Sequence, residues 1–124
     1  MDNETLDRMF HDLNVPIEGG SGHWQVTLEH ARIICLTDET HNRMRFIAPI
    51  REIEGMESAD LTRCLEANFH TALDVKYAIS DGVLWSAFIH PLAELSEKQA
   101  QDALQQVYAG VLNYGTTYLS LIHI

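Results

Sequence analysis

The stretch from Ile79 to Leu92, ISDGVLWSAFIHPL, restricts the fold more than any other part of the chain. An Asp-Gly pair between two strand-like runs is typical of a β-hairpin, because a type I′ turn needs positive φ at both central positions. A loop of two residues also fixes the register, so Ser80 should face Val83 across the hairpin. The sequence therefore predicts two antiparallel strands around Asp81-Gly82, the second of which ends before Pro91.

The two faces of this hairpin differ in chemistry. Side chains alternate between faces along a strand, so the register sorts them into two sets. The first face should lie in the core, and it carries Val75, Tyr77, Ile79, Leu84 and Phe88. The second face is polar on one strand and apolar on the next, and it carries Lys76, Ala78, Ser80, Val83, Trp85, Ala87 and Ile89. A strand with one face in water should not be apolar on both, so something is expected to cover this second face.

Three more strands are expected upstream, at 23–29, 32–38 and 43–50, because their apolar residues alternate or cluster in short runs. The links between them are too short for parallel crossovers, so they should form an antiparallel meander. Together with the hairpin they predict one five-stranded antiparallel sheet.

Helical spacing of apolar residues appears in three segments. Residues 3–13 form the first, with Asp2 or Asn3 as its cap. Residues 58–73 form the second, with a ridge of Leu61, Leu65, Phe69 and Ala72. The third begins at about residue 97, where Ser96 and Gln99 fit a capping box. Residues 116–124 (TTYLSLIHI) are compatible with a continued helix and with an extended segment.

The element order is therefore α-β-β-β-α-β-β-α, which predicts an α+β fold in one domain, residues 1–124. Pro16 and the cluster Gly19-Gly20-Ser21-Gly22 are interpreted as a flexible link between the first helix and the first strand.

The net charge of the chain argues against some classes of partner. Eight basic and eighteen acidic residues give a formal charge of −10. Nucleic acid and anionic membranes both require a basic footprint, so neither is expected as a partner. Residues 1–14 lack the apolar run of a signal peptide, and the two cysteines fit buried free thiols, so a cytoplasmic location is expected.

Catalytic signals are weak. The seven histidines are scattered and show no metal-ligand spacing, and no serine or cysteine lies in a nucleophile motif. We expect no metal, no cofactor and no enzymatic activity. The remaining enzymatic or ligand-binding alternative is a cleft lined by Tyr77, Ser86 and His90.

Arginines are concentrated between residues 32 and 63, and Arg43 and Arg45 share one strand face. Two interpretations stay open for them. They form a solvated outer face balanced by nearby acids, or they anchor a carboxylate or an acidic segment of a partner.

Apolar surface is the strongest functional signal. Three helices can cover one face of a five-stranded sheet but not both, and exposed apolar patches mark interaction sites. Tryptophan is enriched at binding hot spots. The expected partner-binding residues are Trp85, Val83, Ala87, Ile89, Trp24, Leu6 and Phe10. The contact of a homodimer is expected from helix 58–73 or from the last hairpin.

The segments LTRCLEANFHTA (61–72) and KYAISDGVLWSAFIHPLAEL (76–95), followed by the capped helix from Ser96, carry a family resemblance. In these residues and in element order, the chain resembles the Tir-chaperone (CesT-like) family of bacterial type III secretion chaperones and the YbjN-like domains that share their fold. The resemblance implies a small, acidic, non-enzymatic homodimer that binds an extended segment of a secreted effector. The alternative that it implies is a YbjN-like regulatory or sensory domain that acts through protein contacts.

Overall fold

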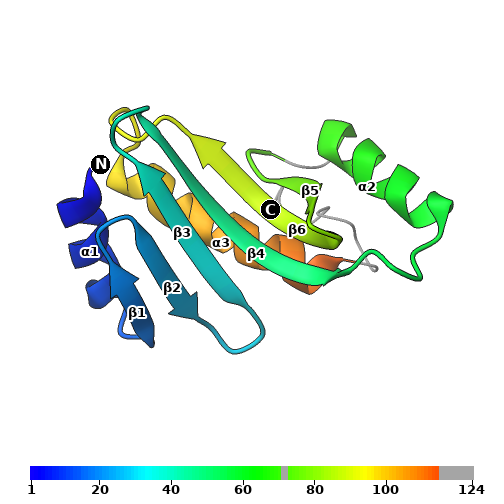
Figure 1. Ribbon diagram of the computed structural model, residues 1–124, viewed down its shortest axis with the longest axis horizontal. Coiled ribbons are helices and arrows are strands. Elements are labelled where there is room, and N and C mark those ends of the chain that lie inside the picture. Colours follow the sequence, from blue (N-terminus) through cyan, green and yellow to red (C-terminus); the bar gives the residue numbers. More distant parts are fainter. Residues whose placement is uncertain (71–72, 115–124) are drawn as a thin grey trace.

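The computed structural model describes residues 1–70 and 73–114. Within these residues three helices accompany one antiparallel sheet of six strands, in the order β1-β2-β3-β4-β6-β5 (Figure 1). The elements along the chain are α1 (Asn3–Asp12), β1 (Ile17–Gly20), β2 (His23–Thr27), β3 (Arg32–Asp38), β4 (Arg43–Glu52), α2 (Ser58–His70), β5 (Lys76–Ser80), β6 (Val83–His90) and α3 (Glu97–Asn113).

The predicted α+β class is confirmed, but the prediction of five strands is wrong. The glycine cluster is not a flexible link, because β1 pairs with β2 through it and Ser21 and Gly22 form the two-residue turn, with φ of 53° and 106°. Gly19 has a φ of +91°, and a Cβ built on it would lie 2.2 Å from the carbonyl oxygen of His23. Glycine is needed here for a close backbone approach within a hairpin.

The central hairpin has the predicted geometry. Asp81 and Gly82 have φ of 51° and 75°, and Ser80 faces Val83. Both predicted caps are also present, since Asp2 and Ser96 each form a capping box with the residue three positions later.

Element ends differ from the predicted bounds by a few residues. The first strand of the meander ends at Thr27, and β4 continues to Glu52 past an irregularity in its pairing between Pro49 and Arg51. The interpretation of residues 116–124 lies outside the described residues.

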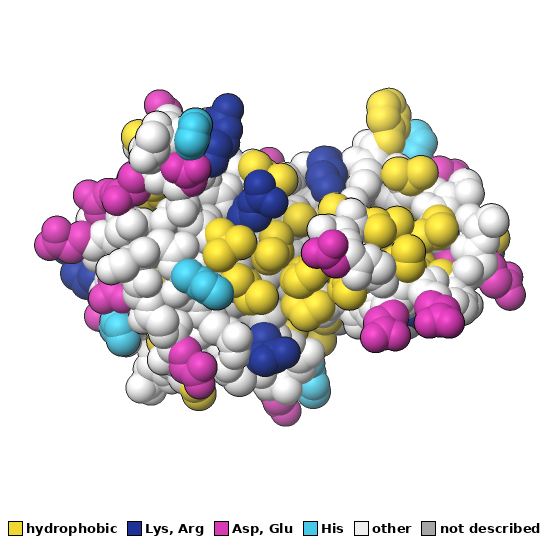
Figure 2. All heavy atoms as spheres, viewed as in Figure 1, with side chains coloured by type: hydrophobic (Ala, Val, Ile, Leu, Met, Phe, Trp, Pro, Cys, Tyr) yellow, Lys and Arg dark blue, Asp and Glu magenta, His cyan; other side chains and the backbone are white. Residues whose placement is uncertain are grey.

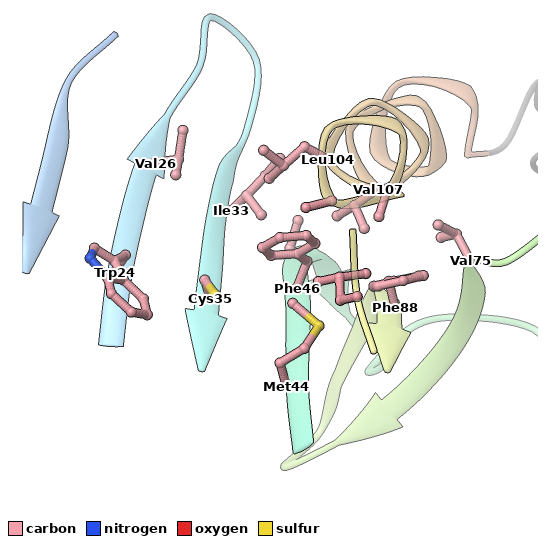
Figure 3. Close-up of a cluster of buried hydrophobic side chains, with 14 of the residues drawn as sticks. Trp24, Val26, Ile33, Cys35, Met44, Phe46, Val75, Phe88, Leu104 and Val107 are labelled. Atoms are coloured by element: carbon pink, nitrogen blue, oxygen red, sulfur yellow. The ribbon is translucent and has the colours of Figure 1, made fainter. Parts of the chain in front are cut away.

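Helices α1 and α3 pack on one face of the sheet, which we call the inner face; in Figure 1, α3 lies behind the sheet and α1 lies at the left, beside β1. Phe10 of α1 packs on Trp24, with ring centroids 5.4 Å apart, and Phe46 and Phe88 continue this aromatic cluster along the sheet (Figure 3). Under α3, the buried hydroxyl of Ser86 donates a hydrogen bond of 2.9 Å to the carbonyl oxygen of Val107. Helix α2 lies instead beside β5 at the sheet edge (Figure 1).

Candidate functional site: an uncovered sheet face

The second face of the sheet, which we call the outer face, is turned toward the viewer in Figure 1, and none of the three helices crosses it. No described helix is left for the outer face, because α1 and α3 both cover the inner face and α2 lies at the sheet edge. The question raised by the apolar hairpin therefore has a structural answer within the described residues: no helix of the protomer covers its second face.

Apolar side chains from three neighbouring strands meet on this outer face. Ile47 of β4 lies directly between Ile34 of β3 and Ala87 of β6, and Pro49 faces Trp85. We call this set the outer-face patch, and Figure 2 shows hydrophobic side chains gathered at the centre of the face. Its members are Ile34, Leu36, Ile47, Pro49, Val83, Trp85, Ala87 and Ile89.

The hairpin residues predicted to bind a partner share this face. Ile89 is 59% exposed, Val83 and Trp85 are half-buried, and Ala87 is buried among its neighbours. The indole N–H of Trp85 donates a hydrogen bond of 3.2 Å to the carbonyl oxygen of Ser80, which fixes the ring across the hairpin. The four residues therefore form one surface, and their role in binding stays a prediction.

The other three predicted contacts occupy the core. Trp24, Leu6 and Phe10 are each 0% exposed, because α1 packs against β1 and β2 on the inner face. The indole N–H of Trp24 is satisfied inside the protomer by a hydrogen bond of 2.9 Å to Asp7 Oδ1. We therefore correct the expectation that these three side chains form accessible surface.

Basic side chains flank the patch on the same face. Arg45 of β4 lies between Leu36 and Ile89 in the register, and its side chain is exposed. Arg43 lies two residues before it on the strand, and Figure 2 shows Lys and Arg side chains close to the hydrophobic cluster.

A second apolar surface lies where α2 meets β5. We call it the α2–β5 surface, and its members are Leu61, Leu65, Phe69 and Ile79. Leu65 is 71% exposed, Phe69 83% and Ile79 52%. The helix instead buries Cys64 and Ala67. Beneath these side chains is a pocket of about 270 Å³, which Leu61, Leu65, Ile79 and Tyr77 help to line.

Sequence reasoning missed a third apolar feature, a groove of about 380 Å³ on the inner face beside α3. Leu13, Val15 and Leu28 contribute to its lining together with Leu104 and Tyr108 of α3. Apolar residues at the ends of elements, such as Val15 after α1 and Leu28 after β2, were the available signal.

Tyr77 faces Ser86 across β5 and β6, but none of the described pockets is lined by Tyr77, Ser86 and His90 together. Tyr77 lines the pocket under α2, Ser86 is fully buried under α3, and His90 lies against Phe88 in another pocket. In residues 1–70 and 73–114, no three His, Cys, Asp or Glu side chains lie close enough to hold a metal ion. None of the described helices has the length and apolarity to cross a bilayer.

The thiols of Cys35 and Cys64 are both buried, and neither is activated as a nucleophile. Burial raises the pKa of Cys35 well above its ordinary value. Burial, with the charge of Asp60 as a second cause, raises the pKa of Cys64 to about 11. Nucleophilic chemistry needs the thiolate, so neither environment activates its cysteine.

Comparisons with known proteins identify the fold. No protein-family model matches the chain, and no curated protein does. Solved structures do match, and one is a chain of the ExoU–SpcU heterodimer from the type III secretion system of Pseudomonas aeruginosa. It has a TM-score of 0.70 and 13% identity, and the match covers 94% of this chain and 96% of that chain.

Two further structures agree with it. A chain of the Yersinia pestis type III secretion chaperone SycH in complex with a fragment of YscM2 has a TM-score of 0.69 at 16% identity, with coverage of 91% and 98%. YbjN from E. coli has a TM-score of 0.63 at 14% identity, with coverage of 97% and 90%. The expected resemblance to this fold is thereby confirmed.

Proposed function

We propose that this protein is a non-enzymatic, protein-binding module that works as a homodimer and holds an extended segment of a type III secretion substrate. The observation that carries the proposal is the uncovered outer face with its apolar residues from three adjacent strands. Contiguous apolar surface on a soluble protein marks an interaction site, and extended polypeptides bind along sheets with alternate side chains in apolar pockets.

The matched solved structures support the polypeptide partner. They include a chaperone–effector complex of HopA1 and SchA, the ExoU–SpcU heterodimer and SycH with its YscM2 fragment. Each of these structures is a complex of two polypeptides, and a shared fold offers a similar surface for a partner.

The α2–β5 surface is the proposed homodimer contact. Its exposed leucine and phenylalanine side chains lie on a helix that projects beyond the sheet, where a two-fold related copy can reach them (Figure 1). An isologous contact places the same patch of both copies together, and an uncharged apolar ridge satisfies that requirement. The two surfaces then have separate occupants, a second copy at α2 and a substrate segment on the outer face.

A regulatory role of the YbjN-like kind is the second candidate, favoured by the fold match to YbjN. It uses the same surfaces for a partner that is not exported. The neighbouring genes separate the two roles, because a secretion chaperone is usually encoded beside its substrate.

The test is co-purification from the native host with the wild-type chain and two variants, Trp85→Asp and Ile89→Ala. The wild type should recover a specific polypeptide, Trp85→Asp should lose it, and Ile89→Ala should weaken it, with the helical circular dichroism signal kept. Leu112→Asp is the matched control, because Leu112 is an exposed apolar side chain (46%) on α3, away from the outer face. Equal recovery of the partner by wild type and Trp85→Asp would refute the proposal.

A further inference from the structure

Arg45 lies beside the outer-face patch, and no acidic side chain among the described residues pairs with it. Resting on the function proposed above, we infer that the patch selects a segment that carries an acidic residue among apolar ones, and that Arg45 is the residue that recognises the carboxylate. The inference concerns the chemistry of the partner, which the apolar patch alone does not define.

The outer face differs in charge from the rest of the molecule. Four basic side chains occupy outer-face positions of the sheet, namely Arg32, Arg43, Arg45 and Lys76, out of eight in the chain. Only three acidic side chains occupy such positions, namely Glu18, Asp38 and Glu52, out of eighteen in the chain. These seven residues sum to a formal charge of +1, whereas the whole chain has −10. A partner with acidic residues therefore finds its complement here and repulsion elsewhere.

Two of the other three basic side chains, Arg43 and Lys76, have local partners. Arg43 donates a hydrogen bond of 3.3 Å to the carbonyl oxygen of Asn42 and faces Asp38 across the strands. The ammonium of Lys76 donates to the carbonyl oxygens of Asn68 and Leu73, at 2.9 and 3.2 Å.

Arg45 has no such arrangement. Among the described residues, its guanidinium forms no hydrogen bond and no ion pair, and its cross-strand neighbours Leu36 and Ile89 are both aliphatic. A partner segment that covers Leu36 and Ile89 also excludes water from the guanidinium of Arg45. Burying an unpaired guanidinium is strongly unfavourable, whereas a carboxylate can bind it through two parallel hydrogen bonds. Arg45 therefore disfavours segments that lack an acidic residue at this position and favours segments that carry one.

A second copy of the chain is a poor occupant of this face. An isologous contact would bring the four basic side chains of one copy toward the same four of the other. Like charges in an interface are unfavourable, and the uncharged α2–β5 surface offers a better self-contact. A different polypeptide is the occupant that the charges favour.

The spacing along β4 predicts a pattern in the partner. Arg45, Ile47 and Pro49 occupy alternate positions on one face, about 7 Å apart at the usual rise of a strand. An extended segment lying along β4 presents its own alternate side chains at the same interval. The expected pattern is acidic-x-apolar-x-apolar, or its reverse if the segment runs in the opposite direction.

The test is selection of 12-residue peptides from a displayed random library on three immobilised proteins. Wild type should enrich the acidic-x-apolar-x-apolar pattern, and Arg45→Glu should lose the acidic preference or exchange it for a basic one. Lys98→Glu is the matched control, because it makes the same change in net charge at an exposed position of α3, and it should select as the wild type does. Trp85→Asp should abolish enrichment, which places the binding on the outer face.

Synthetic peptides then give affinities. A selected peptide with Glu should bind wild type about tenfold more tightly than its Gln version, and the Lys version should bind more weakly still. Raising sodium chloride from about 0.05 M to 0.5 M should weaken the Glu peptide and leave the Gln peptide nearly unchanged. With Arg45→Glu the order of Glu and Lys peptides should reverse.

The outcomes separate the two proposals. Enrichment of apolar peptides without an acidic preference, lost in Trp85→Asp, refutes the role of Arg45 and leaves the binding function intact. An acidic preference that survives Arg45→Glu also refutes it. If wild type enriches no peptide that depends on Trp85, the proposed function fails, and the inference about Arg45 fails with it.

Discussion

The side chain of Asn68 on α2 forms hydrogen bonds with both backbone groups of Tyr77 at the edge of β5. The N–H of Tyr77 donates a hydrogen bond of 2.8 Å to Asn68 Oδ1, and Asn68 Nδ2 donates one of 3.0 Å to the carbonyl oxygen of Tyr77. One amide side chain thus occupies a donor and an acceptor that a further strand would otherwise use. The same pair of bonds fastens α2 to the sheet edge, where it presents the α2–β5 surface.

Replacing Asn68 with alanine should loosen α2 rather than unfold the core. Loss of two partly buried hydrogen bonds is expected to cost about 1–3 kcal/mol and to lower Tm by about 4–12 °C. Amide hydrogen exchange should become faster in α2 and β5 and stay slow in β3 and β4. Glu66→Ala, an exposed change on the same helix, should leave exchange unaltered, and equal protection of α2 in both variants would contradict this account.

Disruption of the α2–β5 surface should convert the proposed homodimer to a monomer. Light scattering on the wild type at tens of micromolar should give about twice the chain mass of 14.1 kDa. Phe69→Glu should give the mass of a single chain, because it places a charge in the centre of an apolar contact. Leu112→Glu on α3 serves as the control and should stay dimeric, and a wild type that is monomeric under these conditions would exclude the proposed contact.

Two glycines with positive φ should respond differently to substitution. At Gly82, at the tip of the central hairpin, an added Cβ would have no atom within 4 Å. Only the φ of +75° opposes Gly82→Ala, so the change should lower the free energy of unfolding by about 1 kcal/mol. Gly19→Ala adds a clash with the backbone of His23, so its effect on the free energy of unfolding should be larger and should include loss of β1 pairing. Urea denaturation measures both, and equal costs would show that β1 is not held in the hairpin described.

The thiols should react slowly in the folded protein. With a pKa of about 11, Cys64 at pH 8 is roughly one part in a thousand thiolate, against about a quarter for an ordinary cysteine. Reaction with an aromatic disulfide reagent should therefore be slow at pH 8, should accelerate as the pH rises toward 11, and should become fast for both cysteines in guanidinium chloride. A Cys64→Ser variant isolates Cys35, and rapid native reaction of either thiol would contradict the described burial.

Much of this architecture is predictable because local interactions fix it. The Asp81-Gly82 turn imposes its register on both strands, and each capping box is complete within four residues. Alternation then assigns the faces, so Val83, Trp85, Ala87 and Ile89 fall on one side whatever packs on the other. The sequence similarly predicts that more apolar surface exists than one layer of helices can cover.

The predictions that were wrong depend on strand pairing and helix docking, which the side-chain pattern does not reveal. β1 has only four residues, two of them glycine, and it exists because β2 supplies its partner hydrogen bonds. Trp24 has the same alternation as Trp85, yet the indole of Trp24 is enclosed and that of Trp85 is half-buried. The reason is that α1 packs on the inner face beside β2, whereas none of the described helices crosses the outer face. Side-chain pattern determines which residues share a face, but the docking of the helices decides which face is left for a partner.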